Sequence, residues 1–195
     1  MIPRMLEAQL RKAAETSSIV SLVGPRQSGK TTLARAVFPK KPYVSLEDPD
    51  IRAYATADPR GFLGDHKEGA VLDEIQRTPQ LLSYLQGIVD RDPVPGRFIL
   101  TGSQHFLLMR DVSQSLAGRT SILTLLPLSL PEIAASHGGT AADSLIHRGF
   151  YPRLYERDLD PYPVLRDYFQ TYVERDVRSL LRVHDLVASF ENPER

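Results

Sequence analysis

The amino-acid sequence predicts an α/β fold, a three-layer sandwich in which a five-stranded parallel sheet lies between two layers of helices. Three observations support this prediction. Apolar strand patterns alternate with helical patterns through residues 1–133, which is typical of parallel sheets. A glycine-rich segment, GPRQSGKTT, stands between the first strand and the helix that follows it. The chain of 195 residues is 42% hydrophobic and 25% charged, so it can bury a sizeable core.

Five short runs have strand character because they are apolar or β-branched and are bounded by glycine, proline or charged residues. They are residues 17–24, 42–48, 69–74, 97–103 and 121–129. The third run, GAVLDE, ends in two acids, and Pro127 halts the fifth. We therefore expect five strands in the first part of the chain.

Helical patterns occupy the segments around these strands. We expect an amphipathic helix over 5–15, a helix over 30–38, one or two short helices over 48–66 and a helix over 78–92. In the last of these, we expect Thr78 to cap the helix and Pro79 to take its first position.

The character of the chain changes in its last third. Residues 135–143 are small and polar and predict a loop, whereas residues 161–181 have the broad apolar face of a long helix. We therefore divide the chain into a domain over 1–133, which includes the N-terminal helix, and a segment over 134–195. This second segment is predicted to be a mainly helical linker, or the truncated start of a further domain.

Composition excludes several classes of function. The chain has no cysteine, which excludes disulfides, thiolate zinc sites and cysteine nucleophiles. Its formal net charge is +0, so the total charge does not call for nucleic acid or an anionic membrane as a partner. No run approaches the roughly 18 apolar residues of a membrane span, and the N-terminus does not resemble a secretory signal. We therefore expect a cytoplasmic protein that does not enter the membrane.

The glycine-rich segment matches the pattern G-x-x-x-x-G-K-[ST] from Gly24 to Thr31, which we call the phosphate loop. Its glycines allow successive backbone N–H groups to turn inward, and the following helix adds the partial positive charge of its N-terminus. Lys30 is expected to reach the β- and γ-phosphates of a nucleotide, and the Thr31 hydroxyl to bind Mg²⁺. The complete motif between a strand and a helix makes an ordinary glycine turn a much poorer interpretation.

The expected nucleotide-binding residues run through the loop into the helix: Gly24, Pro25, Arg26, Gln27, Ser28, Gly29, Lys30, Thr31 and Thr32. The motif does not fix Arg26 and Gln27, and the simpler interpretation is that both are solvated loop residues.

The two acids that end the third strand supply the second half of this predicted site. In sheets of this kind an aspartate at the end of a neighbouring strand holds Mg²⁺, and Asp73 fits that role. Glu74 follows directly and is expected to act as the general base that activates a water molecule. An ordinary acidic strand end is the alternative, and the complete phosphate loop upstream weakens it.

Two further side chains are weaker candidates. Ser103, or Thr101 beside it, ends the fourth strand and is expected to sense the γ-phosphate or orient the water, although a satisfied turn hydroxyl is an equal alternative. Arg119 precedes the fifth strand and is expected to reach the γ-phosphate of a neighbouring subunit. A surface arginine at a helix end is an equally good interpretation of Arg119.

Two other nucleotide-using classes fit less well. Guanine-specific enzymes of the Ras type read the base with N-K-x-D. The single asparagine of this chain, Asn192, stands in the tail, so that motif is absent and guanine specificity by this route is ruled out. Small-molecule kinases share the phosphate loop but usually lack a water-activating glutamate such as Glu74. A kinase is therefore the least favoured of the nucleotide-dependent functions.

Together, the segments GPRQSGKTT, AVLDEIQRTPQLL, FILTGSQ and LAGRTSILTLLPLSLPEI resemble the AAA-type ATPases of bacteria and archaea that carry a C-terminal domain of unknown function. The resemblance covers most of residues 15–133 and extends to RGFYPRLY and YFQTYVERDVRSLL. It implies a P-loop fold with an added strand, which binds ATP and Mg²⁺ through Lys30, Thr31, Asp73 and Glu74. Family members usually continue through a winged-helix-like segment and a nuclease-like domain.

This resemblance predicts a chain that corresponds to the N-terminal half of such a protein, as a fragment, a truncated product or a reduced member. We expect it to hydrolyse ATP and to couple hydrolysis to an unknown protein partner, with DNA binding possible only through a missing C-terminal half. The apolar face of the helix 161–181 is expected to pack on the ATPase domain or to mediate a homo-oligomer. The alternative is an ATP-dependent switch with little turnover.

Overall fold

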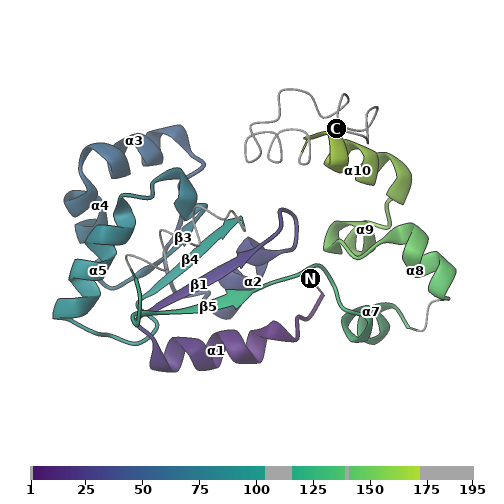
Figure 1. Cartoon of the computed structure of the whole chain (residues 1–195), viewed down its shortest axis with the longest axis horizontal. Coiled ribbons are helices and arrows are strands. Elements are labelled where there is room, and N and C mark those ends of the chain that lie inside the picture. The colour runs from purple at the N-terminus through teal and green to yellow at the C-terminus, as the bar shows by residue number, and fades with distance from the viewer. Residues whose placement is uncertain (1, 104–115, 139–140, 172–195) are drawn as a thin grey trace, which may run out of the picture. The chain divides into compact units, whose positions relative to one another are not determined.

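The computed structural model describes residues 2–103, 116–138 and 141–171. By its internal contacts the chain divides into two compact units, residues 1–138 and 139–195. The first unit holds the sheet and the helices around it, and the described part of the second, residues 141–171, is helical (Figure 1). The predicted division at residues 133 and 134 stays a prediction.

The first unit is built on a five-stranded sheet in which every pair of neighbouring strands is parallel. The strands are β1 Ile19–Gly24, β2 Tyr43–Ser45, β3 Ala70–Asp73, β4 Phe98–Ser103 and β5 Thr120–Thr124, in the order β2-β3-β4-β1-β5. Strand β4 therefore lies between the strand that precedes the phosphate loop and the strand that ends in Asp73. This arrangement confirms the predicted parallel sheet with an added strand.

Two apolar layers hold the helices against the two faces of the sheet. On one face, β1, β3 and β4 pack against α1 Leu6–Thr16 and α2 Lys30–Val37. On the other face, the strands pack against α3 Pro49–Ala57, α4 Pro59–Asp65 and α5 Leu81–Arg91. Because side chains alternate between the faces of a strand, β1 sends Val20 and Leu22 to the first layer and Ile19 and Val23 to the second. The result is the predicted three-layer sandwich (Figure 1).

The predicted start of α5 is wrong. The helix begins at Leu81 with Gln80 as its N-cap, and Thr78 instead ends a short 3₁₀ helix, η1 Ile75–Arg77. The backbone N–H of Thr78 donates to the carbonyl of Ile75 at 3.0 Å, and within the described residues its buried hydroxyl has no hydrogen-bond partner, so Thr78 caps no helix. A threonine and proline at the start of a helical pattern did not reveal the turn that precedes them.

The segment after β5 also differs from the prediction. Strand β5 ends at Thr124 instead of residue 129, and a helix, α7 Leu130–His137, covers part of the predicted loop 135–143. Ser129 and Glu132 form a capping box, and Pro131 occupies the first turn of this helix, where proline is tolerated. The sequence predicts a break at Pro127, but it does not reveal that Pro131 lies in the first turn of a helix.

The second unit contains three short helices in the described residues. They are α8 Ala142–Arg148, α9 Pro152–Glu156 and α10 Pro161–Tyr168. Tyr151 and Tyr168 connect the last two helices, with their hydroxyls 2.9 Å apart. The helix predicted over 161–181 is present in its first part, and its remainder from residue 172 lies outside the described residues. Among the helices that the structure describes, none is long and apolar enough to cross a membrane.

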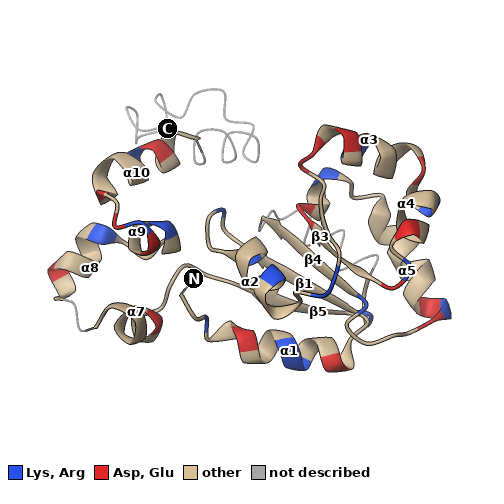
Figure 2. Cartoon of the chain, turned by 180° about the vertical axis from the view of Figure 1, so that it is seen from behind, with Lys and Arg blue, Asp and Glu red and all other residues tan. Residues whose placement is uncertain are grey.

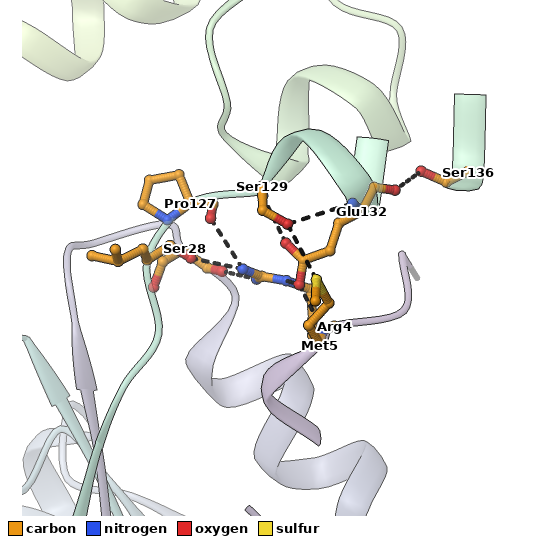
Figure 3. Close-up of polar contacts among 8 residues, drawn as sticks. Arg4, Met5, Ser28, Pro127, Ser129, Glu132 and Ser136 are labelled. Carbon is orange, nitrogen blue, oxygen red and sulfur yellow. Dashed lines mark hydrogen bonds and ion pairs between the residues drawn. The ribbon is translucent and has the colours of Figure 1, made fainter. Parts of the chain in front are cut away.

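Glu132 joins the two ends of the first unit. Its carboxylate accepts hydrogen bonds from the backbone N–H groups of Met5 and Ser129, each at 2.7 Å. Arg4 adds a buried ion pair with 3.1 Å between Nε and Oε1 (Figure 3). Burial by itself raises the pKa of Glu132, but the hydrogen bonds from Ser129, Met5 and Arg4 outweigh it and lower the pKa.

This lowered pKa predicts an acid-sensitive contribution to stability. A carboxylate whose pKa is lower in the folded state contributes fully above its unfolded pKa of about 4.3, and the contribution is lost as the pH falls through the folded pKa. The difference in free energy of unfolding between the wild type and Glu132→Gln should therefore shrink as the pH falls from neutral to about 3. Urea unfolding at a series of pH values measures this difference. Glu15→Gln, which alters an exposed glutamate of α1, is the control, and an equally pH-dependent difference for it would contradict the prediction.

Candidate functional site

The candidate site lies at the carboxyl edge of the sheet, where three central strands end. Strand β1 leads into the phosphate loop at Gly24, and the register pairs Gly24 with Ser103 at the end of β4. Strand β3 ends at Asp73, with Glu74 directly after it. Because parallel strands carry their carboxyl ends to one edge, the fold brings together segments that are far apart in the sequence (Figure 1).

The backbone of the phosphate loop requires glycine at two positions. Gly24 has φ +154°, and a Cβ there would lie 2.1 Å from the carbonyl oxygen of Leu125. Gly29 has φ +94° and forms the N-cap of α2. Gln27 also has positive φ, at 61°, and is exposed, whereas Ser28 is buried. The loop therefore has a backbone conformation that requires glycine at positions 24 and 29.

Lys30 is folded back onto the loop. Its side chain is buried, and Nζ donates to the carbonyl oxygens of Gly24 at 3.0 Å and Pro25 at 2.8 Å. Burial lowers the pKa of Lys30, and the negative charges of Glu74 and Asp73 oppose that shift. The ammonium group therefore lies inside the loop that the motif assigns to phosphate.

Asp73 accepts hydrogen bonds from three different elements. Oγ1 of Thr31 on α2 lies 3.0 and 3.1 Å from its two carboxylate oxygens, and the hydroxyl of Tyr43 on β2 lies 2.7 Å from one of them. Thr101 on β4 donates a third, short bond. Burial, followed by the hydrogen bond to Asp73, raises the pKa of Tyr43 to about 12. The aspartate is thus fixed against the hydroxyl that the motif assigns to the metal.

These side chains fit a magnesium ion. Mg²⁺ prefers oxygen ligands and is usually bound by one or two protein oxygens together with substrate phosphates and water. The Thr31 hydroxyl and the Asp73 carboxylate already lie in contact beside the phosphate loop. No sulfur or imidazole ligand is needed there.

Glu74 stands in an unusual backbone conformation. Its φ is 57° and its ψ is 46°, in the left-handed region that non-glycine residues rarely adopt. This turn directs the chain from β3 into η1, and Gln76 on η1 reaches back to donate to Oε2 of Glu74. Burial and the charge of Asp73 raise the pKa of Glu74, while Lys30 and the Gln76 bond act in the opposite direction.

Like Tyr43, whose hydroxyl contacts Asp73, Gln76 is a site residue that the sequence pattern does not single out. Its Nε2 donates both to Glu74 and to Oγ of Ser103, which is 3.0 Å away. It therefore links the expected base to the end of β4. The only sequence signal was the segment DEIQ, in which the glutamine stands two positions after the glutamate.

The structure brings most of the predicted site residues to one edge of the sheet. There, Thr31 contacts Asp73 and Gln76 links Glu74 to Ser103, while Lys30 lies on the loop, where the charges of Glu74 and Asp73 act on it. Within the loop, Pro25 and Arg26 are half-buried, and Thr32 is exposed at the start of α2. Of the two hydroxyls proposed at β4, Thr101 contacts Asp73 and Ser103 contacts Gln76.

Arg119 lies away from this edge. It directly precedes β5, and its carbonyl accepts a hydrogen bond from the N–H of Ile19, the first residue of β1, at the amino end of the sheet. Its guanidinium pairs with Asp90 near the end of α5, at 3.0 Å between Nη2 and Oδ2. Arg119 therefore does not contribute to the site of its own chain.

A family of known sequences matches this site. The sequence pattern of the AAA domain family matches residues 16–134, which include the phosphate loop and both acids. The chain belongs to this family. Proteins of this P-loop ATPase family generally bind ATP with Mg²⁺, and this agrees with the oxygen ligands and the buried lysine described above.

The curated relatives are longer proteins. The chain is 36% identical over 176 residues to the uncharacterized proteins Rv2008c of Mycobacterium tuberculosis and Mb2031c of Mycobacterium bovis. The match covers 89% of this chain and 39% of each relative, so the chain spans about two fifths of their length.

Solved structures share the fold at low sequence identity. The Walker-type ATPase PABY2304 of Pyrococcus abyssi aligns with a TM-score of 0.58 and 13% identity, over 93% of this chain and 76% of that one. AMPPCP-bound DnaA of Aquifex aeolicus aligns with a TM-score of 0.54 and 15% identity, over 92% of this chain and 64% of that one. At these identities the likeness establishes the P-loop ATPase fold of this domain.

The contact between Gln76 and Glu74 predicts a defect in turnover without a defect in binding. Gln76→Leu removes the amide that holds one carboxylate oxygen of Glu74. A misplaced catalytic group costs about tenfold to a hundredfold in rate, so kcat for ATP should fall by that amount with Kd unchanged. Gln80→Leu, at the exposed N-cap of α5, should leave both constants unchanged. Steady-state kinetics and titration calorimetry measure the two constants, and an unchanged kcat for Gln76→Leu would contradict the positioning role.

Proposed function

We propose that this domain hydrolyses ATP with Mg²⁺ by attack of water on the γ-phosphate. The observation that carries the proposal is the meeting of the phosphate loop, the Thr31–Asp73 contact and Glu74 at one edge of the sheet. A loop that only bound phosphate would not require a second carboxylate after Asp73. Membership in the AAA domain family supports the same reaction class.

In the proposed reaction the loop amides and Lys30 hold the β- and γ-phosphates. A water oxygen forms a bond to the γ-phosphorus while the bond to the bridging oxygen of ADP breaks, and the water proton passes to Glu74. Magnesium held by Thr31 and Asp73 would neutralise the charge that develops on the phosphate oxygens. Gln76 donates to Oε2 of Glu74, which leaves Oε1 without that bond and available to accept the proton.

Glu74 is suited to this role by its surroundings. Burial and the neighbouring charge of Asp73 raise its pKa, which makes its carboxylate a stronger base than a solvated glutamate. The left-handed backbone at Glu74 turns the chain sharply into η1, where Gln76 can reach the carboxylate. The raised pKa of Glu74 and the orientation of its carboxylate therefore both support its assignment as the general base.

Lys30 would change partners when the nucleotide binds. Its ammonium group is bonded to the carbonyl oxygens of Gly24 and Pro25, and phosphate oxygens would replace them. The second candidate function, an ATP-dependent switch with little turnover, would use this rearrangement, since binding alone would then alter the loop. The two candidates differ only in whether Glu74 completes the reaction.

Coupling to a partner is part of the proposal. The relatives of this chain are much longer than the region that matches it. We therefore assign the process that ATP hydrolysis drives to regions such as those outside the match, or to an unknown protein partner. A contribution of DNA is proposed only through such parts. Assembly into a homo-oligomer would bring Arg119 of one subunit to the γ-phosphate of the next.

Substitution of Glu74 tests the reaction class. Glu74→Gln should bind ATP with unchanged affinity and lose turnover by about a hundredfold or more, because the amide cannot accept the proton. Lys30→Ala should lose ATP binding in either candidate function. Phosphate release assays and calorimetry measure the two properties. Turnover that survives in Glu74→Gln would show that Glu74 is not the base, and binding of ATP without turnover in the wild type would favour the switch.

A mixing experiment tests the role of Arg119 across subunits. If Arg119 acts on the site of a neighbour, turnover per wild-type subunit should rise with protein concentration. Arg119→Ala and Glu74→Gln subunits should each be inactive, and their mixture should recover part of the activity because some interfaces combine an intact arginine with an intact glutamate. Arg91→Ala, which alters an exposed arginine of α5, is the control. The absence of recovery at every mixing ratio would remove this assignment.

A further inference from the structure

Arg4 is a buried arginine whose guanidinium contacts the outside of the phosphate loop. It is 9% exposed, although arginine is rarely buried unless it is paired. Nη1 donates to the carbonyl oxygen of Ser28 at 2.6 Å, and Nη2 donates to those of Leu126 at 2.7 Å and Pro127 at 3.3 Å. Nε pairs with Glu132 (Figure 3). All three nitrogens therefore have partners, and one of those partners belongs to the predicted phosphate site.

The bond to Ser28 fixes the orientation of a peptide group in the loop. A trans peptide is planar, and its N–H points opposite to its C=O. Because the carbonyl of Ser28 points at Arg4, the N–H of Gly29 points away from Arg4. Gly29 stands at the start of α2, where the motif expects N–H groups to contact phosphate.

This peptide group needs such a constraint. Gly29 has φ +94°, and glycine adopts positive and negative φ with similar ease, so the peptide before it can rotate at low cost. Among the residues that the structure describes, the buried side-chain oxygen of Ser28 has no hydrogen-bond partner, so the serine side chain does not hold this peptide group. Within the described residues, Arg4 is the side chain that bonds the carbonyl of Ser28.

The guanidinium is itself held in place. Glu132 neutralises its charge, and the backbone N–H groups of Met5 and Ser129 bind the same carboxylate. The carbonyls of Leu126 and Pro127 fix the far side of the planar group. A lysine could not reproduce this, since its single ammonium lacks the fork of donors that contacts several acceptors in one plane.

We infer that Arg4 is a positioning residue for the phosphate chain of the nucleotide: by holding the carbonyl of Ser28, it keeps the N–H of Gly29 aimed at the bound phosphates. This inference rests on the proposed function, because it needs ATP in the phosphate loop. It extends the site to the segment before α1, which the sequence motif does not include.

The test compares two variants that treat the buried ion pair differently. Removing Arg4 alone would leave Glu132 buried without its partner, which destabilises proteins strongly. The double variant Arg4→Met/Glu132→Gln removes both charges, and Glu132→Gln alone keeps the bond from Arg4 to Ser28. Arg11→Met is the surface control, because Arg11 pairs with Glu7 on the exposed side of α1.

The expected result is a loss of affinity with the rate preserved. Calorimetry with Mg·ATP should give a Kd about tenfold to a hundredfold higher for the double variant, the size expected for one lost bond to a charged group. KM should rise with it, while kcat should stay within about twofold because Glu74 is untouched. Arg11→Met should bind ATP within about twofold of the wild type, and Glu132→Gln, which loosens the guanidinium but keeps its bond to Ser28, should bind ATP more tightly than the double variant.

Other results would overturn the inference. A double variant that binds ATP as the wild type does, but melts at a lower temperature without nucleotide, would give Arg4 a purely structural role. If the double variant does not fold, Arg4→Lys replaces it, and wild-type affinity in that variant would overturn the inference equally. A wild-type protein that binds no ATP would instead refute the proposed function, so the two failures are distinguishable.

Discussion

The site is organised by the need of one buried carboxylate for hydrogen-bond donors. Asp73 is almost completely withdrawn from solvent at the end of β3, and a charge there is tolerated only if donors surround it. The donors come from α2, β2 and β4 in the form of Thr31, Tyr43 and Thr101. Satisfying Asp73 therefore ties the end of β3 to β2, to β4 and to the first turn of the helix that follows the phosphate loop. Glu74 directly follows Asp73 in the chain and Gln76 comes two positions later, so this arrangement also sets their positions.

The main lines of the fold could be predicted because its signals are local. A strand, a glycine-rich turn and a helix in succession predict the loop from Gly24 to Thr31, and alternating strands and helices predict the parallel sheet. The acids 73 and 74 could be assigned because they follow a buried strand directly. The structure places both beside the loop, as parallel strands require.

The remaining features could not be predicted because their causes lie in tertiary contacts. Arg4 and Glu132 are 128 positions apart, and no local pattern indicates that they form a buried pair. Gln76 owes its role to a reversal of the chain at Glu74, which has no sequence signature. The predicted start of α5 is wrong because a 3₁₀ turn that ends before Thr78 delays the helix to Leu81, and the sequence does not indicate α7 because a proline can begin a helix as well as end a strand.

The left-handed backbone at Glu74 has a consequence for how this domain balances stability against activity. A side chain at φ 57° carries a strain of about 1 kcal/mol or more that glycine or asparagine would avoid. A chain shaped by folding alone would place one of those two residues at position 74. The glutamate that stands there instead makes the native state less stable than the backbone allows. A substitution of Glu74 that relieves this backbone strain should therefore raise the melting temperature of the domain. The same substitution would remove the proposed base and lower the rate of ATP hydrolysis.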